Sequence, residues 1–294
     1  MKIHLPNSAY IGNIDSFLRG VDTANPESLE ISSNQSWISV HPVVLSMVAA
    51  LGMLVKPTSI ACGTFNAKSA HYLERMGLFR LLRIDSGMRI HEHESAGRFV
   101  PLTQIKNSNE LSTFITDMVP LLHVEPKQAD SIRYVVSELV RNVLEHAESP
   151  FGAIVCAQYH SKSRMIRIGI ADTGLGIKKT INQSHPAKTH LAAIQLALIP
   201  GITGTTKKEG GTEFNAGAGL FFIKSIAKSN HNFFMIYSGD AFYKLLKSKL
   251  KKLYADPFQD RHSKSEDFPF WQGTVVGIDI SLENTQEFSS LLDL

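Results

Sequence analysis

The chain has 294 residues, of which 43% are hydrophobic and 19% charged, and its formal net charge is +3. These values are typical of a globular protein long enough for one or two compact domains, and they exclude extensive disorder. The charge is close to balanced, so it does not call for nucleic acid or an anionic membrane as a partner. The longest apolar segment, 47–55, is too short to cross a bilayer and the N-terminus lacks the apolar core of a signal peptide, so a cytoplasmic protein without a membrane segment is expected.

The first third of the chain alternates between two kinds of pattern. Strand-like segments at 28–33 and 59–63 alternate with helix-like segments at 41–55 and 67–82. The polar, glycine-containing segment 85–99 then interrupts the pattern. We therefore predict an α/β fold with a small domain over residues 1–95 and a second domain over residues 96–294.

A long amphipathic helix is predicted at 126–147, after a first helix at 108–122. The apolar residues that would pack it on a sheet are Ile132, Val135, Val136, Leu139, Val140 and Val143. Glu138, Asn142 and His146 follow at every fourth position and therefore share one side of this helix. Three polar groups in a row indicate a site, although a solvent-exposed helix face explains the same row.

Two strands are predicted next, at 152–159 and 165–171, and the second ends in the loop "ADTGLGI". Asp172 stands at the end of the strand. Gly174 and Gly176 permit positive φ angles and let another group approach the main chain closely. The loop therefore indicates the floor of a ligand site, with an ordinary turn as the alternative.

Glycine recurs before the helix predicted at 219–229. Gly217 and Gly219 stand at its start, where free backbone N–H groups and the helix dipole favour phosphate, although a flexible loop is the alternative. Two further strands are predicted at 232–239 and 273–282. The last one opens with Gly273 and Thr274, whose hydroxyl is suited to the edge of a nucleobase.

Residues 240–270 form an insertion between these two strands. Its lysines alternate with leucines at helical spacing, which predicts an amphipathic basic helix. A packed surface helix is the first interpretation of this segment, and docking to an acidic protein is the second.

The order of these features resembles the Bergerat-fold ATPases, the GHKL superfamily of gyrases, heat-shock chaperones, histidine kinases and mismatch-repair proteins. The helix with Glu138 and Asn142 comes first, followed by "DTGLGI", the glycine-rich loop, "GAGL" and the strand that opens with "GT". The resemblance covers residues 105–285. It implies a two-layer sandwich with helices on one face of a mixed sheet, and ATP and Mg2+ as cofactors.

The resemblance also implies roles for individual residues. Asn142 would hold Mg2+, Glu138 would position or deprotonate the attacking group, and Asp172 would accept the amino group of adenine. Residues 178–216 would form a mobile lid, from which Lys207 reaches the phosphates. The other nucleotide contacts that it implies are His146, Gly174, Gly176, Ile177, Gly217, Gly219, Leu220 and Thr274.

Within the superfamily, "SELVRNVLEHA" and "GAGLFFIK" are most similar to the anti-sigma-factor serine kinases, and the N-terminal region resembles a STAS domain. A sensor histidine kinase is not expected, because no heptad-patterned helical hairpin with a histidine precedes this region. A gyrase-like enzyme is not expected either, because those carry a further domain after the last strand.

The resemblance thus implies an ATP-binding regulatory protein, acting as an ATPase or a protein serine kinase that switches the binding of a protein partner, with a homodimer as a compatible assembly. Two alternatives remain open. One is a nucleotide-gated scaffold without turnover, and the other is the ATPase subunit of a multi-protein stress or defence system.

Overall fold

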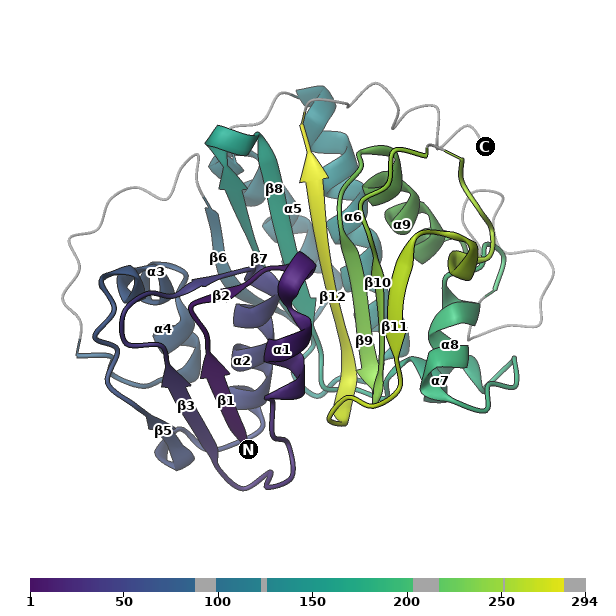
Figure 1. Cartoon of the computed structure of the whole chain (residues 1–294). Helices are drawn as coiled ribbons and strands as arrows, with labels where there is room; N and C mark the ends of the chain where they lie inside the picture. Colours follow the sequence, from purple (N-terminus) through teal and green to yellow (C-terminus); the bar gives the residue numbers. More distant parts are fainter. Residues whose placement is uncertain (88–98, 123–125, 203–216, 251, 283–294) are drawn as a thin grey trace.

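The computed structural model describes residues 1–87, 99–122, 126–202, 217–250 and 252–282, and its centre is a seven-stranded antiparallel sheet (Figure 1). The strands follow the order β11-β10-β9-β12-β8-β7-β6. Their bounds are β6 Phe99–Ile105, β7 Ala153–His160, β8 Met165–Ala171, β9 Phe234–Gly239, β10 Ala241–Leu245, β11 His262–Ser265 and β12 Trp271–Ser281. The sequence predicts a mixed sheet; every strand pair described in this sheet is instead antiparallel.

One face of this sheet packs against helices that lie behind it in Figure 1. Ile166, Ile168 and Ile170 point to this side, as their alternation predicts. The main helices here are α5 Ser108–Leu122, α6 Pro126–His146 and α9 Gly219–Ser229, and two shorter ones, α7 Ile177–Ile181 and α8 His190–Ala197, pack near β9 and β10. None of the described helices is both long and apolar enough to span a membrane.

The N-terminal region forms its own small parallel sheet in the order β1-β3-β5. Its strands are β1 Lys2–Leu5, β3 Leu29–Ser33 and β5 Ile60–Cys62, with a separate pair β2 Ser8–Ala9 and β4 Ser39–Val40; its helices are α1 Asp15–Arg19, α2 Pro42–Met53, α3 His71–Arg75 and α4 Leu78–Leu82. The helix predicted at 67–82 is broken at Gly77, whose φ of 74° lies outside the helical region. Short 3-10 turns occur at Ile11–Asn13, Pro57–Ser59, Lys68–Ala70, Ser161–Ser163 and Pro257–Gln259.

Helix α2 covers the second face of the large sheet, where a pair of glycines lets it approach closely. Gly169 on β8 and Gly277 on β12 are cross-strand partners. A Cβ added to Gly169 would overlap the backbone of Val43 in α2, and one added to Gly277 would lie 3.3 Å from the Cβ of Val43. The hydroxyl of Ser46 also donates to the carbonyl of Gly169 at 3.0 Å. The helices on the opposite face form the two-layer sandwich expected for residues 96–294, and α2 of the N-terminal region adds a third layer on this face.

The same face carries one continuous apolar core with the N-terminal region. Residues of α2 and of the small sheet cluster with Ile154, Ala171 and Val275 of the large sheet. The boundary predicted near residue 95 falls in 88–98, outside the described residues. On either side of that segment, the two parts of the chain are packed against each other.

A buried polar contact joins the two layers at the start of α2. The fully buried His41 accepts the backbone N–H of Val43 at its Nδ1, at 3.0 Å, and its Nε2 lies 3.2 Å from Oδ1 of Asp279 on β12. Burial lowers the pKa of His41, and Asp279 opposes this shift. The neutral ring with its proton on Nε2 satisfies both contacts, because Nδ1 must be free to accept.

The predicted basic helix in the insertion is wrong. Residues 241–245 form β10, because Phe242 points to the α2 side of the sheet while Tyr243 and Leu245 point to the helical side. Successive side chains of β10 point to opposite faces of the sheet, and both faces are buried. Burial on both faces thus prevails over the helical spacing of the leucines. Residues 246–250 and 252–256 are not helical either, and Lys244 is buried and paired with Asp15.

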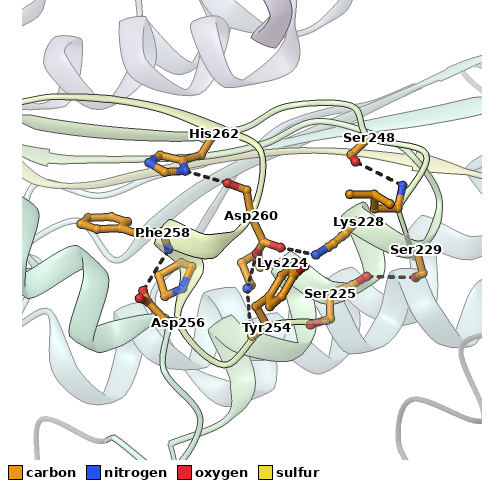
Figure 2. A network of polar contacts seen from close by, with 12 residues as sticks. Lys224, Ser225, Lys228, Ser229, Ser248, Tyr254, Asp256, Phe258, Asp260 and His262 are labelled. Atoms are coloured by element: carbon orange, nitrogen blue, oxygen red, sulfur yellow. Dashed lines mark hydrogen bonds and ion pairs between the residues drawn. The ribbon is translucent and has the colours of Figure 1, made fainter. Parts of the chain in front are cut away.

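The insertion is fixed to α9 by a buried ionic network (Figure 2). Lys224 donates to Oδ2 of Asp260 at 2.6 Å, and Lys228 donates to Oδ1 of the same carboxylate. Lys224 also donates to the carbonyl of Tyr254 at 3.0 Å, and the ammonium of Lys228 lies 4.3 Å from the centre of the Tyr254 ring. One carboxylate thus serves two buried cations, and the segment around Asp260 is held against α9.

Candidate functional site

The polar row of α6 meets the start of α9 in the structure. Glu138 lies so close to Gly219 that a Cβ added to this glycine would overlap Oε2 of Glu138. Burial raises the pKa of the Glu138 carboxyl, and the nearby Arg141 opposes the rise. Two features that are far apart in the sequence, the acidic residue of α6 and the glycine that begins α9, therefore lie side by side.

The loop that follows β8 is packed against the end of α6. The N–H of Leu175 donates to the carbonyl of Ala147 at 2.7 Å, and a Cβ added to Gly174 would overlap the same carbonyl. Glycine is therefore needed at position 174 because the end of α6 occupies the space of a side chain. Gly176, the next glycine of the motif, has a φ of 77° and precedes α7.

The carboxyl of Asp172 is buried at the end of β8, with 2% of the residue exposed. Its Oδ1 accepts the N–H of Gly174 at 2.7 Å, and the backbone N–H of Asp172 donates to the carbonyl of Thr274 at 2.9 Å. Burial raises the pKa of this carboxyl to about 7, and hydrogen bonds from the backbone of Gly174 and Thr274 oppose the rise. A buried acceptor with few donors is suited to a ligand that brings a donor of its own.

The start of β12 holds the loop 172–177 in place through hydrogen bonds. The indole of Trp271 donates to the carbonyl of Asp172 at 3.1 Å, and the amide of Gln272 donates to the carbonyl of Gly174. Gly273 has a φ of 100°, and a Cβ there would overlap the carbonyl of Asp172. Thr274, the predicted residue at the adenine edge, is thereby placed beside the loop.

Ser238 on β9 completes the support. Its hydroxyl accepts the N–H of Ile177 at 3.0 Å and donates to the carbonyl of Gly273 at 2.7 Å. Sequence reasoning found the loop but missed Ser238, Trp271, Gln272 and Ala147, which hold it. The position of Trp271 and Gln272 directly before "GT" is the one signal that could have indicated two of them.

The remaining predicted residues lie around this centre. Asn142 is half-buried on α6 between Glu138 and His146, and Nδ1 of His146 is buried without a hydrogen-bond partner among the described residues. Gly217 has a φ of 77° and accepts the N–H of Gly201 at 3.1 Å, and Leu220 packs against the helical core. Lys207 and residues 203–216 of the predicted lid lie outside the described residues.

The donor set does not resemble a dedicated metal centre. Among the described residues, no group of three or more His, Cys, Asp or Glu side chains could hold a metal ion. Magnesium bound by substrate phosphates needs only one or two protein oxygens, which the row of Glu138 and Asn142 can offer. These residues thus fit a metal that arrives with phosphate groups.

A comparison with known proteins agrees with this geometry. Residues 104–231 match the sequence profile of the histidine kinase-like ATPase domain, which belongs to the GHKL superfamily. The match begins in β6 and ends just after α9, so it includes α6, the loop at 172–177 and the start of α9. No curated protein matched the chain.

Proposed function

We propose that this chain binds ATP with Mg2+ between α6, the loop 172–177 and the start of α9, and that the nucleotide regulates a protein partner. The match of residues 104–231 to the histidine kinase-like ATPase domain supports this proposal. The buried Asp172 carboxyl carries the proposal. An acceptor withdrawn from water is unfavourable unless a donor meets it. The exocyclic amino group of adenine is such a donor, and Thr274 stands beside it to contact the ring.

The phosphates are assigned to the start of α9. A helix N-terminus presents free N–H groups and a positive dipole end, and Gly217 and Gly219 bring no side chain of their own to this place. Glu138 faces this place from α6, as the overlap with an added Cβ at Gly219 supports, and Asn142 follows one turn later on the same side of the helix. When bound, Mg2+ neutralises phosphate charge, and the Asn142 side-chain oxygen is its proposed ligand.

Glu138 is the proposed residue for turnover. Loss of water raises the pKa of its carboxyl, which makes the carboxylate a better proton acceptor than an exposed glutamate. Attack of a water molecule on the γ-phosphorus of ATP would break its bond to the bridging oxygen, release ADP and give hydrolysis. Attack of a serine or threonine hydroxyl of a partner would release ADP in the same way and give phosphoryl transfer of the anti-sigma-kinase type. The proton of either hydroxyl would pass to the Glu138 carboxylate.

Binding of ATP is tested by calorimetry with ATP, GTP and inorganic triphosphate, each with Mg2+. We expect Asp172→Asn to lower the affinity for ATP by roughly tenfold or more, which is the scale of one lost buried hydrogen bond. The affinity for triphosphate should change little. GTP carries a carbonyl in place of the amino group and should bind more weakly than ATP to the parent chain. Asp130→Asn, on the exposed side of α6, is the matched control. Equal loss of ATP and triphosphate affinity in Asp172→Asn would contradict the adenine assignment.

A further inference from the structure

A separate cleft of about 290 Å3 opens on the outer side of the loop 172–177. It lies between α7, the first residue of α8, the end of β9 and the segment before β12. The side chains that define its character are Lys178, Lys179, Asn182, His190, Phe270 and Trp271. Gly176 of the proposed nucleotide loop also lines the cleft, whereas none of these six side chains is a proposed nucleotide contact.

The cleft is positively charged. Lys178 and Lys179 line it, and neither forms an ion pair within the part of the chain that the structure describes. None of its described lining residues is acidic, and the nearby Asp240 is already occupied by Nδ1 of His190 at 2.7 Å. An anionic group in the cleft would therefore meet two ammonium groups, and no lining residue presents a carboxylate.

One wall of the cleft is aromatic. Phe270 is one of the few large apolar residues at the surface, with 50% of it exposed, whereas Trp271 beside it is buried. The ring of His190 meets Phe270 edge to face with 5.7 Å between ring centres. A Cβ added to Gly239 would overlap the His190 ring, so the glycine leaves room for this arrangement. An apolar ring in the cleft would cover Phe270 and remove its surface from water.

We propose that this cleft binds a small aromatic carboxylic acid, with its carboxylate at Lys178 and Lys179 and its ring against Phe270. The two lysines and the aromatic wall line the same small cleft, so a ligand that contacts both must carry a carboxylate and an aromatic ring only a few bonds apart. The volume of this open cleft is at the lower end of the range of small-molecule sites, which favours a small acid over a longer chain.

The cleft is also joined to the proposed adenine loop. Its wall residue Trp271 donates to the carbonyl of Asp172, and its wall residue Ser238 accepts the N–H of Ile177. A ligand that moves either wall residue changes the position of the loop. This regulatory consequence rests on the proposed function, whereas binding in the cleft does not.

Binding is tested by fluorescence without nucleotide. The chain has two tryptophans, so Trp37→Phe, which replaces an exposed residue, leaves Trp271 as the only indole. We expect 3-phenylpropionate to change its emission in a saturable way, and the neutral 3-phenylpropionamide to bind at least roughly fivefold more weakly. The scale follows from the loss of two partly exposed ion pairs.

Substitutions then separate the two parts of the site. The double variant Lys178→Gln with Lys179→Gln should lower the affinity for the acid by a similar factor and leave the affinity for the amide unchanged. The control Lys162→Gln, on the distant β7–β8 turn, should change neither affinity. Phe270→Ser, at an exposed position, should weaken both ligands equally. Equal binding of acid and amide, or no loss in the double-lysine variant, overturns the proposal. A peptide ending in phenylalanine that binds tenfold more tightly than the free acid overturns the assignment to a small molecule.

Discussion

Trp271 and Asp172 are joined by a hydrogen bond of 3.1 Å from indole to backbone carbonyl, across 99 positions of the sequence. The same indole forms part of the cleft wall, so one side chain contacts both the cleft and the backbone of the residue that carries the buried carboxyl. If both sites are as proposed, 3-phenylpropionate should change the affinity for ATP, and ATP should change the affinity for 3-phenylpropionate by the same factor. Titration of each ligand at saturating concentrations of the other measures both factors. Trp271→Phe removes the hydrogen bond and should bring the factor close to one. A factor of one in the parent chain would show that the two sites are not linked.

The titration of Asp172 should control ATP affinity near neutral pH. Its pKa is raised from 3.8 to about 7, so the carboxyl is largely protonated below pH 7 in the free protein. The carboxylate is the form that accepts the amino group, and we expect ATP affinity to fall as the pH is lowered from 8 to 6, approaching tenfold per unit below 7. Inorganic triphosphate carries the same titrating phosphate and is the control. Asp172→Asn should show the pH dependence of triphosphate alone.

The same shift has a defined effect on stability. A raised pKa means that the folded chain holds a proton more tightly than the unfolded chain, so this contribution is present below pH 3.8 and is lost as the pH rises through about 7. In urea unfolding between pH 5 and pH 8, the parent should lose stability relative to Asp172→Asn as the pH rises. Parallel curves would mean that the carboxyl has an ordinary pKa in the fold.

Substitutions of Glu138 and Asn142 should have different effects on nucleotide binding and on turnover. Glu138→Gln keeps the size of the side chain next to Gly219 and removes the proton acceptor, so binding should persist while γ-phosphate release or transfer falls by roughly a hundredfold. Asn142→Ala removes the proposed Mg2+ ligand and should weaken binding of ATP with Mg2+ more than binding of ATP with EDTA. Arg133→Gln, at an exposed position of α6 that pairs with Asp130 and not with Glu138, is the control. A parent chain with no turnover, even with its partner present, would favour the scaffold reading over the enzyme.

The close contact between α2 and the sheet depends on Gly169. Gly169→Ala places a methyl group on the backbone of Val43, which cannot move aside as a flexible side chain would, and should lower the free energy of unfolding by roughly 1–3 kcal/mol. Gly63→Ala is the matched control, because its added Cβ lies 3.7 Å from the nearest atom. Denaturant midpoints of the two variants provide the comparison. A Gly169→Ala protein as stable as Gly63→Ala would show that α2 can move away from β8 without loss.

Asp260 should be the most sensitive residue of the insertion. Asp260→Asn leaves Lys224 and Lys228 buried without a carboxylate, and the loss of one side of a buried ion pair costs about 3–5 kcal/mol. Burial already lowers the pKa of Lys224, and the variant should lower it further, so the loss should shrink as the pH rises toward 10 and lysine gives up its proton. Asp267→Asn, at an exposed position, should be neutral. A loss that does not change with pH would exclude an uncompensated lysine as its cause.

The sequence predicts the parts of the site that short local patterns describe. Helical spacing identified the row from Glu138 to His146, and the end of a strand identified Asp172, because both depend on neighbouring residues. Ser238 and Trp271 could not be found in this way, since each acts on a loop far away in the chain. The insertion was assigned to a helix because leucine spacing carries no information about burial on both faces of a strand, which decides the conformation of β10. The cover over the second face escaped prediction because α2 is apolar on all sides and does not indicate which neighbour it packs against.

Gly169 brings the N-terminal region into direct backbone contact with the large sheet. The first turn of α2 rests on the backbone of β8 without a side chain between them, and Asp172 follows three residues later on the same strand. At about 3.3 Å per residue, the two points are separated by roughly 10 Å of rigid strand. Closely packed backbones pass on a displacement instead of absorbing it. A shift of α2 against Gly169 would therefore displace β8, and this displacement would change the position of Asp172 at the end of the strand.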